Sequence, residues 1–483
     1  MEGALAGLDR RLGDAVEGLT RAHHRRRLSR VGWQRALDPP GTGLWCQGEP
    51  PPRPGNALDV LIDGAAALPR IAAALAAAES YVHIAGWHVD AGFRLGHEPG
   101  APTVGGLLAQ LADRIPVRVL VWAGAPIPVF KPTRADVRRG RDQLCRDTRI
   151  DCVVDSHERP AHCHHEKLVV IDGKVAFVGG IDLTGLGGDR YDRNDHPYRP
   201  AVGWHDAAVC IHGPAVADVA DHFRSRWQEV SGERLDPPVV PDPAGDVELQ
   251  LVRTIPEHVY EFARNGEFRI LEAYSRALRS AERLVYLENQ FLWSPELVAI
   301  LADKLRRPPT PDFRVVVLLP ARANNGADDT KGQLGVLIEA DAGAGRLVAC
   351  TLYSRDPATA RSSPVYVHAK IGIVDDTWLT LGSANLNAHS LFNDSEVNIV
   401  THDPGVVSDV RHRLWAEHLE RSVDAVSGDP TRVIDELWKP LAAASRRQAD
   451  AGETPEHRLT MLSGLSRRAE RLLGPLQGLM VDG

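Results

Sequence analysis

The sequence predicts an α/β protein made of two similar lobes, each a mixed β-sheet flanked by helices, related by pseudo-two-fold symmetry. Short apolar segments with strand character alternate with helical patterns along most of the chain, which is typical of sheets covered by helices. The length of 483 residues exceeds what one hydrophobic core usually serves. One pattern of polar residues also occurs twice, and its two copies divide the chain into related halves.

The repeated pattern begins with a histidine and a lysine two residues apart. At a constant offset of 203 residues, His165, Lys167, Asp172, Gly179 and Leu183 return as His368, Lys370, Asp375, Gly382 and Leu386. An ungapped repeat of such reactive residue types is hard to obtain by accident. It indicates that the two halves meet at one site that needs a pair of histidines and a pair of lysines.

The first lobe is expected over residues 56–235, after an N-terminal extension of residues 1–55 that contains a helix and a proline-rich linker. Short buried runs predict strands, and a hairpin with an Asp172-Gly173 turn carries the first copy of the pattern. The expected elements are helix 65–79, strand 81–87, helix 104–115, strand 117–122, a weaker strand 151–154, hairpin strands 168–171 and 175–178, strand 207–211 and helix 214–230.

The second lobe is expected over residues 247–428, and it repeats the order of the first. Residues 236–246 contain four prolines and are predicted to be the linker between the lobes. Residues 429–483 are predicted to form terminal helices. The elements expected between them are helix 267–281, strand 284–287, helix 295–306, strand 313–319, helix 331–340, strand 347–349, hairpin strands 371–374 and 379–381, strand 397–400 and a helix from 405.

Composition narrows the class of protein. A hydrophobic fraction of 43% with 25% charged residues is ordinary for a soluble globular protein. The N-terminus has no basic and apolar leader, and six cysteines lie without CxxC spacing, so we expect reduced thiols and a cytoplasmic location with membrane association. A net charge of −8 argues against a nucleic-acid partner. The basic run 23–27 could touch anionic lipid, but a solvated helix end is the preferred interpretation.

The chemistry of the repeat suits a phosphate group. Residues two apart on a strand point to the same face, so each copy sets an imidazole beside an ammonium. Two such faces would offer two lysine charges to phosphate oxygens, and no metal or other cofactor is needed for this. A neutral histidine can then attack phosphorus, and a protonated one can give its proton to the leaving alkoxide and later activate water or an alcohol. Asp206 and Glu396 are candidates to orient the two rings.

A metal site is the rival interpretation of the run from His162 to His165. Adjacent residues on a strand alternate between faces, so these side chains cannot all reach one ion, and no second set of ligands stands out in the sequence. We therefore expect no metal there. Two other readings stay open: Glu288-Asn289-Gln290 could satisfy buried hydrogen bonds or contact substrate, and Trp87 and Trp293 could pack in the core or line a substrate channel.

With these motifs in hand, the chain resembles the phospholipase D superfamily. Its signature is HxK, four residues, Asp, six residues and GSxN or GGxD, present twice. The stretch from His164 through Leu183 looks like the first motif of eukaryotic-type members, and Tyr286 to Phe291 is similar to the segment between the motifs. Trp204-His205-Asp206 and Asp394-Ser395-Glu396 match further segments, so the resemblance covers roughly residues 60–425.

The resemblance implies a role for each residue of the motifs. His165 would be the nucleophile and His368 the general acid and base, with Glu396 against His165 and Asp206 against His368. Lys167, Lys370 and Asn385 would bind phosphate with Ser383 close by, and Asp172 and Asp375 would be structural. The first copy has Gly180 and Asp182 where the second has Ser383 and Asn385. A carboxylate would repel phosphate, so a direct ligand role for Asp182 is not expected.

The function expected from this resemblance is that of a phospholipase D. It would hydrolyse the headgroup ester of a glycerophospholipid to phosphatidic acid through a covalent phosphohistidine, with transphosphatidylation as a second outcome. The alternatives are a cardiolipin-synthase-like phosphatidyltransferase, a nuclease of the same superfamily and a non-catalytic scaffold. We expect a monomer that contacts the membrane peripherally, takes a phospholipid substrate and binds no nucleic acid.

Overall fold

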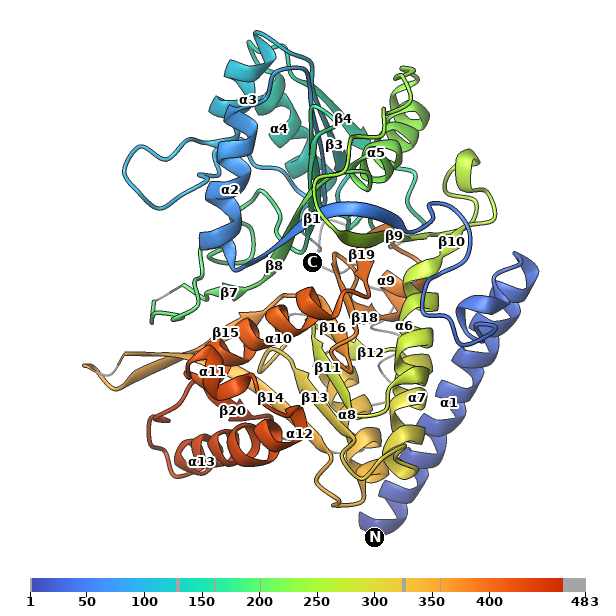
Figure 1. The fold of residues 1–483 in the computed structure, drawn as a ribbon, viewed down its shortest axis with the longest axis vertical. Helices are drawn as coiled ribbons and strands as arrows, with labels where there is room; N and C mark the ends of the chain where they lie inside the picture. Colours follow the sequence, from blue (N-terminus) through green and yellow to red (C-terminus); the bar gives the residue numbers. More distant parts are fainter. Residues whose placement is uncertain are drawn as a thin grey trace.

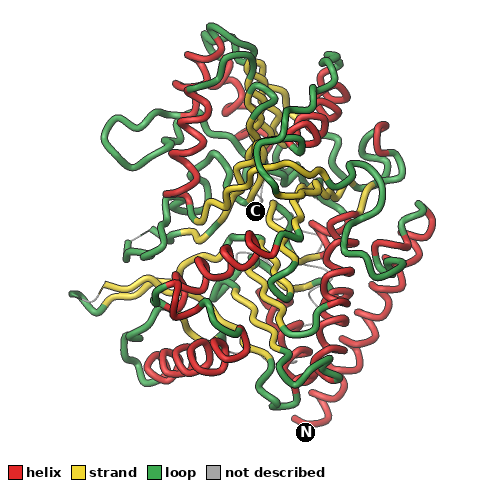
Figure 2. The backbone as a smooth tube through the Cα atoms, in the orientation of Figure 1, coloured by secondary structure: helices red, strands yellow, loops and turns green. Residues whose placement is uncertain are grey.

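A computed structural model describes residues 2–126, 131–159, 162–199, 201–323, 327–356 and 358–463. The fold is mixed α/β, as predicted, and its strands form a large mixed sheet with helices on both faces (Figure 1, Figure 2). Of the helices predicted after residue 429, those beyond residue 463 lie outside the described residues.

The first half of the chain forms one end of the sheet. Its strands pair in the order β4 (Asp151–Asp155), β3 (Val117–Trp122), β2 (Val82–Gly86), β5 (Leu168–Ile171), β6 (Val175–Gly179), β8 (Ala207–His212) and β1 (Arg53–Ile62). One face packs on α2 (Gly64–Ala76), α3 (Val104–Ala112) and α4 (Arg134–Cys145), and the other on α5 (Val216–Ser231).

The second half continues the same sheet, because β1 pairs with both β8 and β9. Its strands follow as β10 (Glu267–Phe268), β9 (Val247–Ile255), β19 (Glu396–Thr401), β17 (Trp378–Gly382), β16 (Ile371–Val374), β11 (Leu284–Glu288), β13 (Arg314–Leu318), β14 (Leu347–Asp356) and β15 (Arg361–Val367). The covering helices are α6 (Arg269–Ser280), α7 (Pro295–Arg306) and α8 (Ala327–Asp341) on one face, and α10 (Pro404–Leu419) on the other.

The remaining elements complete the described chain. They are α1 (Glu2–Arg30), η1 (Gln34–Ala36), β7 (Trp204–His205), η2 (Glu261–Ala263), β12 (Leu292–Trp293), β18 (Leu386–Asn387), α9 (Ala388–Phe392), α11 (Val423–Val426), α12 (Pro430–Val433), the π-helical η3 (Ile434–Trp438), α13 (Lys439–Asp450) and β20 (Leu459–Met461). Among the described helices, none has the length and apolar character that crossing a bilayer requires.

A single apolar core joins the halves. Alternate residues of β5 and β16, such as Leu168, Val170, Ile371 and Ile373, pack into this shared core. The intervening residues of β5, such as Val169, instead face a separate core under α2 and α3. Alternation of this kind follows from the two-residue period of a strand. It holds the two hairpins back to back, so the segments just before β5 and β16 are brought to the same place.

Asp172 and Asp375 lie at the ends of β5 and β16 that are far from these segments. The carboxylate of Asp172 accepts hydrogen bonds from the backbone N–H groups of residues 79, 80 and 81 at 2.7–3.0 Å. That of Asp375 accepts from residues 282, 283 and 284 at 2.7–2.8 Å. Each aspartate therefore satisfies the turn that leads into the neighbouring strand, β2 or β11, and holds the hairpin against it.

Several elements were not predicted. Strands β1 and β9 lie in segments interpreted as linker or left unassigned, and α4 was missed because it is strongly polar. The N-terminal extension was expected to be peripheral with a solvated basic end. In the structure, Leu28 is fully buried, and Arg27 donates to Glu257 at 2.7 Å and to the carbonyl of Phe392 at 2.6 Å. The helix α1 is therefore docked on the second half of the chain.

The turn aspartates give a prediction about stability. Asp375→Ala removes a carboxylate that serves three backbone donors and places alanine at a φ of 52°, a left-handed conformation that alanine disfavours. We expect the free energy of unfolding to fall by about 2 kcal/mol. Asp375→Asn is the matched control, because asparagine tolerates this φ and keeps an acceptor oxygen, and it should lose about half as much. Equal stability of all three proteins in denaturant unfolding would contradict this role.

Candidate functional site

The two histidines of the repeat lie in the segments just before β5 and β16, three residues ahead of the first residue of each strand. Their backbones bond across the halves instead of along their own sheets. The carbonyl of Ser395 accepts the N–H groups of His165 and Glu166 at 2.9 and 3.1 Å, and the carbonyl of His205 accepts those of His368 and Ala369 at 2.7 and 3.0 Å. Each histidine is thus held by the residue that precedes a carboxylate.

His165 is paired with Glu396. Its Nδ1 lies 3.0 Å from Oε1 of Glu396 and 3.2 Å from the carbonyl oxygen of Ser383. The hydroxyls of Ser383 and Ser390 each donate to Glu396 at 2.5 Å. Burial raises the pKa of Glu396 to about 8, although the charge of Lys167 opposes this. The carboxylate is therefore fixed by three donors, and it fixes the orientation of the imidazole.

His368 is paired with Asp206 in the same way. Its Nδ1 lies 2.7 Å from Oδ2 of Asp206, and its ring packs on Trp204 with centroids 4.4 Å apart. Burial lowers the pKa of His368 well below its ordinary value, and the charges of Lys370, Arg190 and Lys167 lower it further. Since two of these charges come from the first half of the chain, the two copies of the motif share one site.

The two lysines face different surroundings. Lys167 lies 3.3 Å from the carboxylate of Asp182, whereas Lys370 lies 3.4 Å from the amide oxygen of Gln290. The side chain of Asn385 also donates to Gln290 at 3.4 Å, and its own oxygen is buried without a hydrogen-bond partner. A carboxylate offsets the first lysine while neutral amides surround the second. The two lysines therefore differ in how far a neighbouring group offsets their charge.

Steric crowding explains why position 180 is a glycine. A Cβ built on Gly180 would lie 2.1 Å from Oδ1 of Asp206. At the equivalent place in the second half, Ser383 fits and donates its hydroxyl to Glu396. A short carboxylate beside glycine thus replaces a long carboxylate beside serine, and this accounts for the departure of the first copy from the GSxN pattern.

Arg190 belongs to this site, although no pattern in the sequence predicted it. It is 4% exposed, its guanidinium stacks 3.6 Å from the ring of Trp204, and its charge acts on both Asp206 and His368. One nitrogen donates to the carbonyl of Leu186 at 3.0 Å, while Nε and Nη1 are buried without partners. A buried cation with two unused donors beside two lysines is suited to an anionic oxygen. Arg190 lies in an irregular loop outside the motifs, so no pattern marked it.

For the segment Glu288-Asn289-Gln290, the sequence left two interpretations open, buried hydrogen bonding or a place in the site. The structure gives these two roles to different residues of the segment. Gln290 faces the lysine and asparagine of the second motif. Asn289 accepts the N–H groups of Phe291 and Leu386 at 3.1 and 3.0 Å, which is a structural role. Glu288 is fully buried and lies 2.9 Å from both His205 and His418. The segment therefore joins the site at one end and supports the core at the other.

A buried network of charged groups lies beneath Asp206. The ring of His205 sits between Asp63 and Glu288, at 2.8 and 2.9 Å, and Asp63 also accepts the backbone N–H of Asp206 at 3.2 Å. The ring of His196 likewise sits between Asp192 and Glu417, at 2.9 and 3.1 Å. With a carboxylate at both nitrogens, each ring donates twice. The network therefore consists of imidazolium and carboxylate pairs that hold Asp206 from below.

The tryptophans considered as channel residues are largely buried. Trp87 stacks on Trp122 with ring centroids 6.1 Å apart, and the ring centroids of Trp293 and His389 lie 5.6 Å apart. Their indole N–H groups have no hydrogen-bond partner among the described residues. Trp87 is 6% exposed and Trp293 is 9% exposed, so both pack chiefly against the protein.

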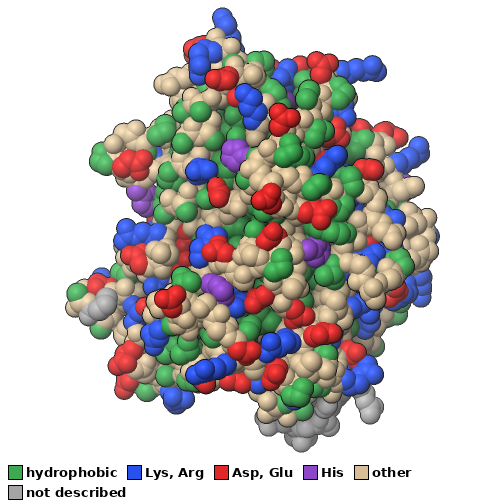
Figure 3. Space-filling model, viewed as in Figure 1, with side chains coloured by type: hydrophobic (Ala, Val, Ile, Leu, Met, Phe, Trp, Pro, Cys, Tyr) green, Lys and Arg blue, Asp and Glu red, His purple; other side chains and the backbone are tan. Residues whose placement is uncertain are grey.

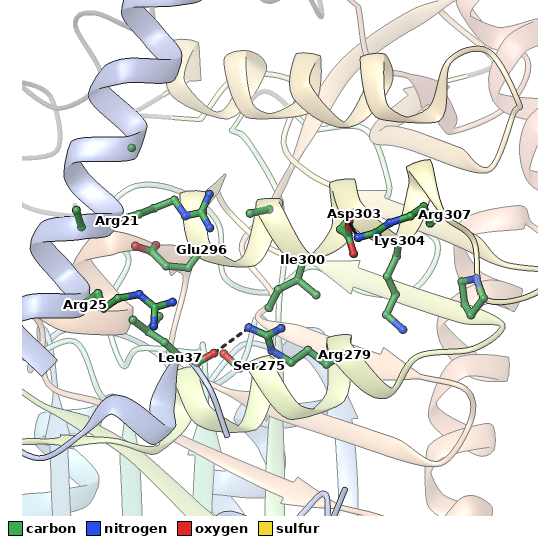
Figure 4. Close-up of a pocket in the computed structure, with 14 residues that line it drawn as sticks. Arg21, Arg25, Leu37, Ser275, Arg279, Glu296, Ile300, Asp303, Lys304 and Arg307 are labelled. Atoms are coloured by element: carbon green, nitrogen blue, oxygen red, sulfur yellow. Dashed lines mark hydrogen bonds and ion pairs between the residues drawn. The ribbon is translucent and has the colours of Figure 1, made fainter. Parts of the chain in front are cut away.

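A large groove lies away from the motif residues. A groove of about 920 Å³ runs between α1, α6 and α7, lined by Arg21, Arg25, Arg279, Lys304 and Arg307 together with Glu296 and Asp303 (Figure 4). None of the motif residues lines it, so cavity size alone would misplace the site. On the face shown in Figure 3, acidic and basic side chains are interspersed rather than gathered in one patch.

Comparison with known proteins agrees with this geometry. Residues 274–417 match the family described as "Cardiolipin synthase, PLD-like domain". The chain is 26% identical over 395 residues to phospholipase D A of Dictyostelium discoideum, covering 63% of this chain and 30% of that protein. It is 29% identical over 265 residues to cardiolipin synthase A of Pseudomonas fluorescens, covering 53% and 47%. The chain belongs to the phospholipase D superfamily.

Within this superfamily the fold match extends over most of the chain. The solved structure of phosphatidylserine synthase from Haemophilus influenzae Rd KW20 aligns with a TM-score of 0.50 at 15% identity, covering 74% of this chain and 86% of that one. The match supports the fold of a phospholipase D superfamily member. The curated relatives named above are much longer than the segment they share with this chain, which spans less than half of each.

Arg190 gives a prediction that does not depend on catalysis. Arg190→Gln should weaken the affinity for inorganic phosphate at least about tenfold, since a charge-assisted hydrogen bond contributes roughly 1.5–3 kcal/mol. Arg193→Gln is the matched control, because Arg193 lies on the same loop but is exposed and paired with Asp195. Isothermal titration calorimetry measures both. Equal phosphate affinity in the two variants would remove Arg190 from the site.

The charged network gives a prediction about pH. Burial alone would lower the pKa of His196, but its hydrogen bonds with Asp192 and Glu417, and the nearby charge of Asp63, raise it to about 9. A raised folded-state pKa stabilises the protein fully below the unfolded value of 6.5, and this stability is lost as the pH rises through about 9.

We therefore expect His196→Gln to cost about 3 kcal/mol more at about pH 6 than at about pH 10. The exposed His97→Gln is the control, and thermal denaturation at both pH values is the measurement. A destabilisation by His196→Gln that is the same at both pH values would show that His196 is not charged in the folded protein.

Proposed function

We propose that this protein is a phospholipase D that hydrolyses the headgroup ester of a glycerophospholipid to phosphatidic acid through a covalent phosphohistidine. The observation that carries the proposal is the pairing of His165 with Glu396 and of His368 with Asp206 in one buried, cationic site. Two imidazoles that are oriented by carboxylates and stand beside two lysines supply a nucleophile, an acid and charge stabilisation for a phosphodiester. The names of the curated relatives support a lipid substrate.

The first step transfers the phosphatidyl group to the enzyme. Because Nδ1 of His165 faces Glu396, the attacking atom is Nε2. A P–N bond forms to this atom as the bond from phosphorus to the headgroup oxygen breaks, and His368 gives its Nε2 proton to the departing alkoxide. Lys370, Asn385 and Arg190 hold the phosphoryl oxygens, so the charge that develops on them meets fixed donors.

The second step releases phosphatidic acid. His368, now neutral, takes a proton from water, the water oxygen attacks phosphorus and the P–N bond breaks. His165 leaves as a neutral imidazole that keeps the proton on Nδ1, hydrogen-bonded to Glu396, and His368 holds the proton taken from water, so the site returns to its starting state. If an alcohol takes the place of water, the same step yields a new phosphodiester, which is transphosphatidylation.

The low pKa of His368 couples protonation to substrate binding. Burial and three neighbouring cations keep the ring neutral when no anion is bound. A phosphodiester adds a negative charge between those cations and so offsets them, which favours the imidazolium that the first step needs. His368 becomes an acid when the substrate is in place.

A cardiolipin-synthase-like phosphatidyltransferase is the second candidate. The match of residues 274–417 to a family described by that activity, and the resemblance to cardiolipin synthase A, favour it. The same site would serve, with the hydroxyl of a second lipid in place of water. A nuclease is disfavoured by the net charge of −8, and a non-catalytic scaffold by the complete motifs in both halves. For either lipid enzyme we propose a monomer that works at the membrane surface from the cytoplasm.

Product assays on lipid vesicles distinguish these activities. Phosphatidylcholine vesicles should release choline and accumulate phosphatidic acid, and oligonucleotides should not be cleaved. Vesicles of phosphatidylglycerol, with and without added alcohol, report transfer: cardiolipin as the main product would favour the second candidate. Cleavage of oligonucleotide without lipid turnover would overturn both.

Two variants and one activated substrate assign the histidines. His165→Ala should abolish turnover of every phosphodiester, whereas His368→Ala should still form phosphoenzyme from phosphatidyl-p-nitrophenol, because that leaving group needs no protonation. Samples denatured at neutral to mildly alkaline pH, where the P–N bond survives, and analysed by mass spectrometry should locate phosphatidyl on His165 in the His368→Ala protein. Phosphatidyl on His368 in the His165→Ala protein would reverse the roles.

A further inference from the structure

A second group of potential ligand atoms lies beside the proposed catalytic site. It consists of His162 in the segment before β5, His389 on α9 and Asp394 just before β19. Nδ1 of His162 lies 2.9 Å from Nδ1 of His389 and 3.5 Å from Oδ1 of Asp394. One ligand atom from each of the three side chains lies within 4.8 Å of the others.

The polar atoms of this group are only partly satisfied by the protein. Oδ1 of Asp394 accepts the backbone N–H of Cys163 at 2.9 Å, but Oδ2 is buried without a hydrogen-bond partner among the described residues, and so is Nε2 of His389. Asp394 is 0% exposed and His389 is 1% exposed. A buried carboxylate oxygen with no donor is costly, and a bound cation would remove that cost.

We propose that His162, His389 and Asp394 bind a divalent transition metal of the zinc class, with a fourth position open to water or to an anionic oxygen. Ligands about 2.0–2.1 Å from a tetrahedral ion stand about 3.3 Å apart. The separations of 2.9 and 3.5 Å lie on either side of this value. Two imidazoles and one carboxylate form a common three-ligand set for zinc, whereas magnesium and calcium prefer oxygen ligands.

The deeper network around His205 offers similar residue types but is arranged differently. There each ring nitrogen of His205 and of His196 faces a carboxylate at 2.8–3.1 Å, so both nitrogens carry protons. A nitrogen that donates a proton has no lone pair for a metal. At His162 and His389 the two rings face each other nitrogen to nitrogen, and at most one of these two atoms can hold a proton without a head-on clash of donors. At least one of the two facing nitrogens of His162 and His389 therefore keeps a lone pair that a metal can bind.

The sequence argued against a metal at residues 162–165 because neighbouring side chains alternate and no second ligand set was visible. The two rings do contact different carboxylates, His165 that of Glu396 and His162 that of Asp394. The missing ligands come from the other half of the chain, on α9 and before β19. A pairing across more than two hundred residues leaves no local spacing in the sequence.

The location suggests what the ion would do. His162 precedes His165 by three residues, and Asp394 precedes Glu396 by two. Between them, the N–H of Ser395 bonds the carbonyl of Cys163 at 3.1 Å. A metal held by both segments would cross-link the strand that carries the carboxylate to the segment that carries the nucleophile, and so hold that pair in register. This inference stands on the ligand geometry and does not require the proposed lipid activity.

Metal binding to the full chain tests the proposal. After dialysis against a chelator, the wild-type protein should take up one equivalent of Zn²⁺ in competition with a chromogenic chelator, and one equivalent of Co²⁺ should give a tetrahedral visible spectrum. His389→Gln and His162→Gln should each weaken the affinity for Zn²⁺ at least about tenfold and change the cobalt spectrum. Zn²⁺ should also raise the melting temperature of the wild type but not of these variants.

Two controls make the outcome decisive. His97→Gln removes an exposed histidine outside the group and should bind like the wild type. His418→Gln removes a member of the deeper network. Loss of Zn²⁺ in His418→Gln with retention in both His389→Gln and His162→Gln would move the ion to that network and overturn the proposal. Absence of one-equivalent binding in the wild type would overturn it as well, leaving a direct hydrogen bond between His162 and His389.

Discussion

The site depends on two backbone carbonyls that cross between the halves of the chain. The oxygen of Ser395 receives two successive N–H groups at His165, and that of His205 receives two at His368. Each carbonyl belongs to the residue before Glu396 or Asp206, so one peptide unit fixes the histidine backbone while the next side chain fixes its ring. Since neither half can supply both partners, the site forms only when the shared core is complete.

The charged groups of the site are buried, and this burial shifts the pKa values of His368 and Asp206. Lys167 lies beside the carboxylate of Asp182, and the charges of Lys370, Arg190 and Lys167 act on both Asp206 and His368. The remaining positive charge lowers the pKa of His368, while Asp206, although close, is itself buried, and its pKa is raised. The site therefore concentrates buried positive charge around its two histidines, which favours an anionic group there.

Much of the fold was predictable from the sequence because its strands are short and apolar and its helices are regular. The hairpins around Asp172 and Asp375 and the helix 295–306 appear where expected. The paired residues of the repeat could be placed because their spacing is local. Arg190 could not, since it reaches the site from a loop with no motif, and neither could His389 as a partner of His162. Strands β1 and β9 were missed because prolines and glycines near them favoured a linker.

The contact between Gly180 and Asp206 limits how this duplicated protein can change over evolutionary time. Replacing Gly180 alone by the serine of the other half would drive a Cβ into Asp206, and lengthening Asp206 alone to glutamate would push its carboxylate past the ring it orients. Either exchange by itself would disturb the contact between Asp206 and His368. The two halves therefore keep different pairs, glycine with aspartate in one and serine with glutamate in the other. Exchanging one pair for the other requires both positions to change together.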